Sequence, residues 1–202
     1  MNNQKHQTVI LITGQKRSGK DTVAKMLQEY LPKSTISSFA GPMKDITANT
    51  FNITLEELDY AKNEGRLKAL LKFKRLVFFT DFRKFLQRFG TEGMRPVFGD
   101  KVWVEQLVTT LPLENTVIAS DWRFPLEKNY LEYLGYDVKT VKVLRENKRE
   151  KKRDMHSSEQ TDRLIADAVL VNDGTLDELH AQVARLAADI LKAEVYKRKY
   201  KE

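Results

Sequence analysis

One short segment places glycines and a lysine at the spacing of a phosphate-binding loop. Residues 14–20 read Gly-Gln-Lys-Arg-Ser-Gly-Lys and fit the pattern G-x-x-x-x-G-K. In that pattern the glycines let the backbone wrap around a phosphate with its N–H groups pointing inward, and the lysine reaches the outer phosphates. Thr8–Thr13 is a short apolar run before the segment, and residues 23–30 carry apolar side chains at helical spacing after it. A buried strand and a helix are the flanks that such a loop requires, so we predict an ATP-binding phosphate loop here.

The position after the lysine departs from the usual pattern. Asp21 stands where a Ser or Thr commonly ligates Mg²⁺, and Thr22 follows it. A carboxylate beside a triphosphate is repelled unless a cation or a donor intervenes. We therefore expect Asp21 to act through Mg²⁺ or its waters, or to orient a phosphate-binding side chain such as Lys16, and Thr22 to contact the α-phosphate. Lys16 and Arg17 are either solvent-facing charges or cations for a second phosphorylated ligand.

Strand and helix patterns alternate around this loop. Apolar runs predict strands at Thr8–Thr13, Thr35–Phe39, Thr116–Ser120, Val138–Leu144 and Ala168–Val171. Helical periodicity predicts helices at Val23–Tyr30, ended by Pro32, at Met43–Thr50, from Phe82 to Phe89 with Gly90 closing the helix, and at Lys101–Thr110, Leu126–Leu134 and Leu176–Leu191. The expected fold is α/β, a P-loop NTPase with a doubly wound parallel sheet of about five strands. We expect one domain over residues 1–202, in which 43–110 form a helical insertion.

Composition excludes several kinds of site. The 202 residues include no Cys, which rules out disulfides, Cys-ligated metals and a thiol nucleophile. Only three His are present, which disfavours a metal site made of His alone. No apolar stretch is long enough for a signal peptide or a membrane span, so we expect a soluble intracellular protein. The net charge of +7 suits a nucleic-acid surface, an anionic lipid surface or a site for phosphorylated ligands. The densest basic stretch is 145–153, and a second lies at the C-terminus, where we read it as a solvated helix end.

Several blocks of the sequence resemble the phage-type deoxynucleoside monophosphate kinases. They keep their order from about residue 8 to 180, and they are Gly14–Thr22 (GQKRSGKDT), Phe39–Asp45 (FAGPMKD), Arg83-x-x-x-Gln87-x-x-Gly90-Thr91-Glu92, Trp103, Ser120–Phe124 (SDWRF), His156-x-Ser158-Glu159 and Val171–Thr175 (VNDGT). The resemblance implies a P-loop kinase that uses ATP and Mg²⁺ and acts in the cytoplasm, the host's if the gene is a phage gene. The loop and two other blocks also look like animal-type phosphomevalonate kinase.

The resemblance and the positions of these blocks assign site residues. The expected ATP-binding residues are Gly14, Arg17, Ser18, Gly19, Lys20, Asp21, Thr22, Asn172 and Gly174, the last two in a turn at the adenine edge. The expected acceptor-binding residues are Lys16, Lys44, Arg83, Gln87, Trp103 and Glu159. Arg83 would bind the monophosphate and Gln87 the base or sugar. The alternatives stay open: a solvated lysine for Lys44, a polar helix face for Arg83 and Gln87, and a core position for Trp103.

The charged residues after the third and fourth strands are the catalytic candidates. Asp121 and Arg123 follow a strand at its carboxyl end, where open α/β sheets bind ligands. Asp121 would hold Mg²⁺ through water, as a second metal residue beside Asp21, and Arg123 would steady the phosphoryl group together with Lys20; an ion pair at the strand end is the alternative. Residues 145–160 are the expected lid, with Arg145 and Arg149 over the phosphates, and a solvated charged face is the alternative. No physical role follows for His156, Ser158 and Glu159.

The expected reaction is transfer of the γ-phosphoryl group of ATP to a deoxynucleoside 5′-monophosphate. Two alternatives remain: a phosphomevalonate kinase-like enzyme with another acceptor, and a nucleic-acid-binding P-loop ATPase that uses the basic stretches. No nucleic-acid module is recognisable in the sequence, which disfavours the second alternative. Residues 54–80 suit either a homodimer surface or part of the acceptor pocket. The accepted bases and the choice between ribose and deoxyribose do not follow from the sequence.

Overall fold

A computed structural model describes residues 7–64, 82–112, 116–146 and 161–199. The chain divides into two compact units, each described here by itself. The first unit combines Met1–Ser38 with Thr110–Glu202, and the second is Phe39–Thr109. The predicted lid falls almost wholly outside the described residues, and the expectation of one domain over 1–202 stays a prediction.

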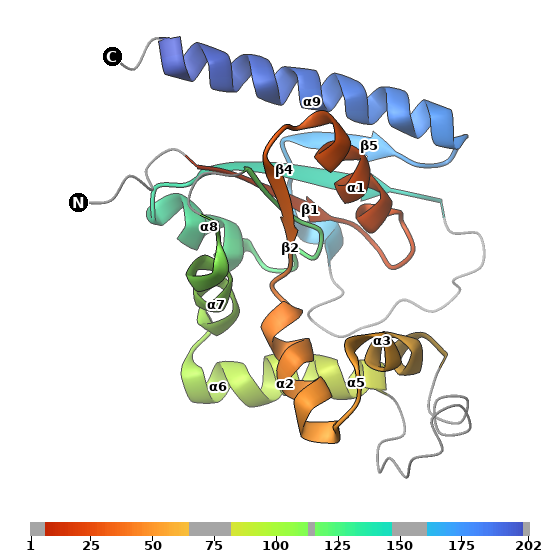
Figure 1. The fold of residues 1–202 in the computed structure, drawn as a ribbon, viewed down its shortest axis with the longest axis vertical. Coiled ribbons are helices and arrows are strands. Elements are labelled where there is room, and N and C mark those ends of the chain that lie inside the picture. The colour runs from red at the N-terminus through yellow and green to blue at the C-terminus, as the bar shows by residue number, and fades with distance from the viewer. Residues whose placement is uncertain (1–6, 65–81, 113–115, 147–160, 200–202) are drawn as a thin grey trace. The chain divides into compact units, whose positions relative to one another are not determined.

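The first unit is built on a sheet of five parallel strands in the order β2-β3-β1-β4-β5 (Figure 1). The strands are β1 (Thr8–Thr13), β2 (Ser34–Ser37), β3 (Thr116–Ala119), β4 (Asp137–Leu144) and β5 (Ala168–Val171). Every residue of β1 is buried, as its continuous apolar run predicts for a central parallel strand. The sheet confirms the predicted α/β fold. Because all five strands are parallel, their carboxyl ends lie at one edge, which we call the carboxyl edge.

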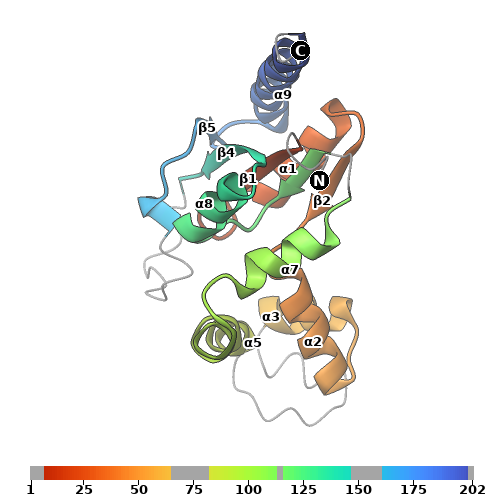
Figure 2. The same ribbon diagram turned by 90° about the vertical axis from the view of Figure 1, so that its left-hand side faces the viewer.

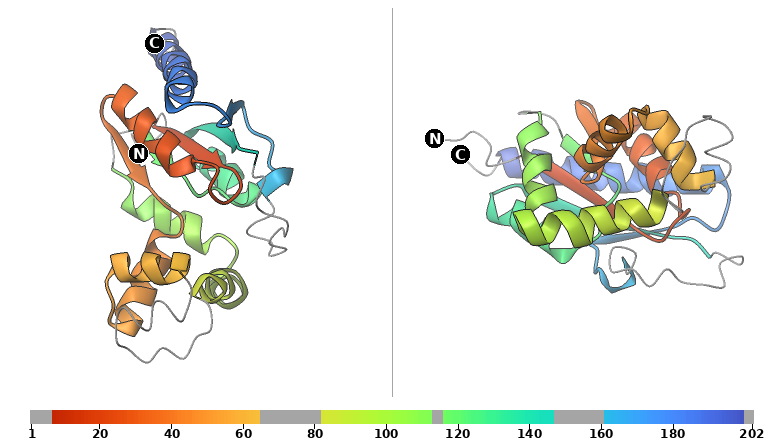
Figure 3. Two further views of the ribbon diagram at one scale, coloured as in Figure 1. Left: turned by 90° about the vertical axis from the view of Figure 1, so that its right-hand side faces the viewer. Right: turned by 90° about the horizontal axis from the view of Figure 1, so that it is seen from below.

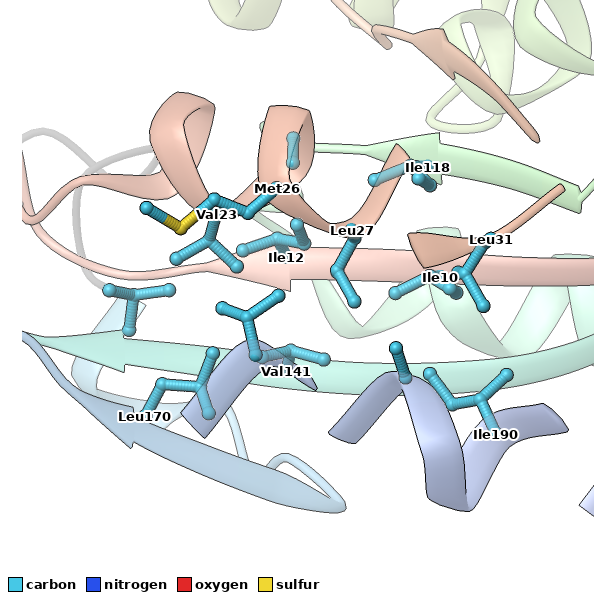
Figure 4. Close-up of a cluster of buried hydrophobic side chains, with 14 of the residues drawn as sticks. Ile10, Ile12, Val23, Met26, Leu27, Leu31, Ile118, Val141, Leu170 and Ile190 are labelled. Atoms are coloured by element: carbon cyan, nitrogen blue, oxygen red, sulfur yellow. The ribbon is translucent and has the colours of Figure 1, made fainter. Parts of the chain in front are cut away.

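Helices cover both faces of this sheet. Helices α1 (Lys20–Tyr30) and α9 (Leu176–Lys199) pack side by side on one face, and α8 (Pro125–Tyr133) packs against β4 on the other (Figures 2 and 3). The core between the sheet, α1 and α9 is wholly aliphatic apart from Met26 (Figure 4). A short 3₁₀ turn, η3 (Thr161–Arg163), precedes β5. Burial of this core fixes the strand ends that carry the candidate site.

The second unit contains helices only, among its described residues. These are α2 (Gly41–Phe51), α3 (Leu55–Glu64), α5 (Phe82–Gln87), η1 (Arg88–Met94), α6 (Arg95–Phe98) and α7 (Val102–Thr110), whose last residue belongs to the first unit. Pro42 lies in the first turn of α2, as predicted, because proline has no N–H that the turn would miss. Phe51 packs edge-on against Phe82 and Phe85, joining α2 to α5.

The prediction that Gly90 ends a helix is wrong. The chain passes without a break from α5 through the π-helix η1 into α6. Gly90 is there for close packing: a Cβ at this position would lie 2.6 Å from the sulfur of Met43. The indole N–H of Trp103 donates to the Gly90 carbonyl at 2.8 Å. Two neighbouring helices thus approach the backbone at Gly90, and π-helical turns within helices are frequent at functional sites.

Candidate active site

The phosphate loop, residues 14–20, joins β1 to α1. Lys20 is the first residue of α1, and its ammonium group donates to the carbonyl oxygens of Gly14 at 2.9 Å and Gln15 at 2.7 Å. The lysine thereby lies over the loop to which it belongs. The α1 N-terminus adds the positive end of a helix dipole at the same place. The Ser18 hydroxyl is buried and has no hydrogen-bond partner among the described residues, which suits a polar atom that pairs with a ligand.

The two cations inside the loop differ in their surroundings. Lys16 is partly buried, whereas Arg17 is exposed. The backbone of Arg17 has a φ of 62°, in the left-handed region that non-glycine residues seldom adopt. Local strain of this kind persists where surrounding structure imposes it, and it gathers at ligand-binding sites. Neither position decides between a solvent-facing charge and a contact with a second ligand.

Asn172 anchors the loop from the end of β5. Its side-chain amide donates to the carbonyl oxygen of Ser18 at 2.8 Å, and its backbone N–H donates to Leu144 at the end of β4. Gly19 has a φ of 98°, and a Cβ there would lie 2.4 Å from the amide nitrogen of Asn172. The last peptide of the loop and Asn172 are therefore in direct contact. The next residue, Asp173, accepts a hydrogen bond from the backbone N–H of Glu146, so the turn after β5 is also bonded to the segment that follows β4.

Two hydroxyl–carboxylate pairs lie at the carboxyl edge. The Ser120 hydroxyl, directly after β3, donates to Asp21 of α1 at 2.7 Å. The Ser38 hydroxyl, directly after β2, donates to Asp121 at 2.7 Å. Each of the two acidic residues predicted to be near the metal is thus oriented by a serine from a different strand end.

The segment that carries Arg123 is fixed by Glu127 and Trp122. The buried Glu127 carboxylate accepts the backbone N–H groups of Arg123 at 3.0 Å and Phe124 at 3.1 Å, and it thereby caps α8. Trp122 is buried, its indole donates to the Phe124 carbonyl, and its backbone N–H donates to Ile12 of β1. The Arg123 backbone is consequently held in place from both sides.

The predicted site residues divide between the two units. The first unit holds those of the loop and the strand ends at the carboxyl edge, namely Gly14, Lys16, Arg17, Ser18, Gly19, Lys20, Asp21, Thr22, Asp121, Arg123, Arg145, Asn172 and Gly174. Arg145 directly follows β4 and is exposed. The second unit holds Lys44, Arg83, Gln87 and Trp103. Arg149 and Glu159, like His156 and Ser158, lie outside the described residues.

The candidate acceptor residues of the second unit have distinct environments. Lys44 forms an ion pair with Asp59 of α3 at 3.0 Å. Arg83 and Gln87 lie one turn apart on α5 and are partly buried. Trp103 is 5% exposed and bonded to Gly90, which favours its core alternative over stacking on a base. Of the four predicted residues described in this unit, Lys44, Arg83 and Gln87 are therefore less buried than Trp103.

The oxygen atoms around Asp21 fit a magnesium ion. Among the described residues no three acidic or histidine side chains cluster as a complete metal site. Mg²⁺ does not need one, because it is usually held by one or two carboxylates, water and the substrate phosphates. Asp21, Ser120 and Asp121 supply hard oxygen donors beside the phosphate loop, so the residues present suit the ion.

The sequence does not predict the structural roles of four residues. Ser38, Ser120 and Asp59 are oriented toward predicted residues by contacts between distant parts of the chain, for which the sequence carries no local sign. Glu127 could have been found, because a glutamate shortly after a proline that starts a helix is typical of a capping arrangement.

Comparisons with known proteins identify relatives of the chain. The sequence profile of the deoxynucleotide monophosphate kinase family matches residues 8–70 and 79–183. No curated protein is significantly similar. Among solved structures, a gluconokinase from Sinorhizobium meliloti 1021 shares 13% identity with a TM-score of 0.43, covering 95% of this chain and 99% of its own. A dephospho-CoA kinase from Campylobacter jejuni shares 16% identity with a TM-score of 0.42, covering 92% and 98%. Within the described ranges, no helix has the length and apolar character to cross a membrane.

Proposed function

Because the chain belongs to the deoxynucleotide monophosphate kinase family, we propose that it transfers the γ-phosphoryl group of ATP to deoxynucleoside 5′-monophosphates, giving deoxynucleoside diphosphates and ADP. The protein is a nucleotide kinase, and the proposal concerns its acceptor and its site residues. One observation carries it: the phosphate loop with Lys20 and the oriented carboxylates of Asp21 and Asp121 meet at one sheet edge. That edge is where doubly wound sheets bind nucleotides.

The chemistry assigns the residues of the first unit mainly to positioning and charge neutralisation. Phosphoryl transfer passes through a largely dissociative transition state, so an enzyme has little covalent work to do. In this proposal Lys20 binds the β- and γ-phosphates, and Arg123 stabilises charge on the transferred group. Arg145 would assist from the end of β4, and Arg149 would act with it.

Magnesium would bind with ATP near Asp21, Ser120 and Asp121. When bound, it would neutralise part of the negative charge on the phosphates. The carboxylates are kept in orientation by the hydroxyls of Ser120 and Ser38. Among the described residues of the proposed ATP site, Asn172 donates to the loop, and Thr22, in the first turn of α1, would contact the α-phosphate.

Acceptor binding is proposed for the second unit. Lys44 and Arg83 would bind the monophosphate, and Gln87 would contact the base or sugar. All three lie within the residues matched by the family profile. The proposed reaction needs no catalytic histidine, because the acceptor phosphate is already anionic near neutral pH.

A coupled assay for ADP formation tests the proposal. The purified protein is given ATP and Mg²⁺ with each of the common dNMPs, each NMP, phosphomevalonate, or no acceptor. We expect turnover to depend on at least one dNMP and to be lost in Lys20→Met. Turnover with phosphomevalonate and with no nucleotide would show that phosphomevalonate is the acceptor. ATP hydrolysis that does not depend on any monophosphate would contradict the assignment of the site to a kinase reaction. Product identification by chromatography confirms that a diphosphate forms.

A further inference from the structure

The pairing of Asp21 with Ser120 reverses a familiar distribution of side chains. In P-loop NTPases the residue after the loop lysine is usually a Ser or Thr whose hydroxyl binds Mg²⁺, and an Asp at a strand end completes the set. Here the carboxylate is on the loop side, at the start of α1, and the hydroxyl follows β3. The two side chains nevertheless meet, with the Ser120 hydroxyl donating to Asp21 at 2.7 Å.

The partner of Asp21 is Ser120 although an aspartate is its direct neighbour in sequence. Asp121 is instead bonded to Ser38, at the end of β2. At the end of β3, the side chain that contacts the loop side is therefore the Ser120 hydroxyl. The carboxylate that it contacts is that of Asp21, at the start of α1. An exchange of Asp and Ser also preserves the number of side-chain atoms between the two backbones, so the same span is bridged in either arrangement.

We propose that Asp21 and Ser120 form one functional unit for Mg²⁺-ATP, in which the carboxylate and the hydroxyl have exchanged places between the loop and β3. Ser120 is thereby a further residue of the metal-nucleotide site. Its hydroxyl proton is donated to Asp21, and its oxygen lone pairs stay available to the ion or to a water bound by the ion. The inference rests on the proposed binding of Mg²⁺ with ATP.

Exchanging the two residues tests the idea directly. Calorimetry measures the affinity for the β,γ-imido analogue of ATP, with MgCl₂ and with EDTA, for wild type, Asp21→Ser, Ser120→Asp, Ser120→Ala and the double variant Asp21→Ser/Ser120→Asp. We expect the gain in affinity due to Mg²⁺ to fall at least about tenfold in Asp21→Ser, because the carboxylate of the pair is lost and two hydroxyls remain. Ser120→Asp places two carboxylates together and should weaken binding in EDTA, where no cation offsets their repulsion of the triphosphate. The double variant has the wild-type composition and should recover the wild-type gain due to Mg²⁺ to within about threefold.

Several results would overturn the proposal. They are a double variant whose gain due to Mg²⁺ is no larger than that of Asp21→Ser, a Ser120→Ala variant with the full gain, and a wild type that gains nothing from Mg²⁺. Affinity in EDTA and the melting temperature without nucleotide report folding separately from metal binding. The measurement needs no acceptor, so absence of turnover on every dNMP would contradict the proposed function without affecting this comparison.

Discussion

The side-chain amide of Asn172 donates a hydrogen bond of 2.8 Å to the carbonyl oxygen of Ser18. It joins the end of the last strand to the phosphate loop, across 154 positions of sequence. The backbone N–H of Asn172 donates to the carbonyl oxygen of Leu144, so Asn172 links the loop to the ends of both β4 and β5. The shape of the loop therefore depends on the end of the sheet as well as on its own sequence.

Asn172→Ala should weaken ATP binding selectively. The variant removes the donor to Ser18, and a hydrogen bond of this kind contributes about 1 kcal/mol, so we expect the KM for ATP to rise about fivefold. The KM for the acceptor should change little. Asn129→Ala is the matched control, since Asn129 is an exposed residue of α8. Equal effects on both substrates, or none beyond those of the control, would contradict the anchoring role.

Gly19 and Asn172 should behave as a coupled pair. A Cβ at Gly19 would lie 2.4 Å from the Asn172 amide nitrogen, and the φ of 98° disfavours alanine independently. Gly19→Ala should therefore destabilise the wild type more than it destabilises the Asn172→Ala variant, in which the clashing group is gone. Urea unfolding of the four proteins gives the coupling, which we expect to be about 1 kcal/mol or more. Strict additivity would show that the backbone conformation alone explains the cost.

Much of the first unit followed from local pattern, whereas its site partnerships did not. An apolar run of strand length followed by Gly or Asp identified β1 and β3 nearly to the residue, because central parallel strands must be apolar on both faces. The contacts of Ser120 with Asp21 and of Ser38 with Asp121 join distant segments, and no periodicity encodes them.

Glycine was the main source of error in the helical unit. At Gly14 and Gly19 the glycine serves the loop, as predicted from the motif, with positive φ at both. At Gly90 the sequence pattern predicts a helix end, but the glycine permits Met43 and Trp103 to approach a continuing helix. Sequence alone does not distinguish a glycine needed for its backbone freedom from one needed for its small size.

Glu127 should act as a positioning residue for Arg123. Its carboxylate accepts two backbone N–H groups, and Glu127→Ala leaves both without this partner, at a cost of about 1–2 kcal/mol. We expect kcat to fall more than either KM changes, because the segment that carries Arg123 loses its anchor. Glu127→Gln retains a carbonyl oxygen that can accept both donors and should restore most of kcat.

The control for this pair of variants lies on the same helix. Glu132→Ala breaks an exposed ion pair with Lys128 and should leave kcat unchanged. Steady-state kinetics and melting temperatures are measured for all three variants. If Glu127→Ala lost stability but kept the wild-type kcat, Glu127 would be a helix cap and nothing more.

Lys44 and Asp59 should affect acceptor binding in opposite directions. Lys44→Ala removes a cation proposed for the monophosphate, so the acceptor KM should rise about tenfold or more. Asp59 holds the same ammonium at 3.0 Å and competes with the phosphate. Asp59→Asn should therefore lower the acceptor KM about two- to threefold, within the range of a partly exposed ion pair. The KM for ATP serves as the internal reference, and a rise in acceptor KM in both variants would instead make Asp59 a residue that positions Lys44.

Trp103 should matter for stability rather than for base recognition. Trp103→Phe keeps an aromatic ring but leaves the buried Gly90 carbonyl without its donor, which costs about 1–3 kcal/mol. We expect a lower melting temperature and an unchanged ranking of kcat/KM among the dNMPs. The exposed Phe98 offers a matched aromatic control as Phe98→Leu. If the Trp103 ring instead stacked on the acceptor base, Trp103→Phe would leave the melting temperature unchanged. The altered ring would then change the ranking of kcat/KM among the dNMPs, because it would stack differently on each base. The two readouts together therefore decide which role the indole has.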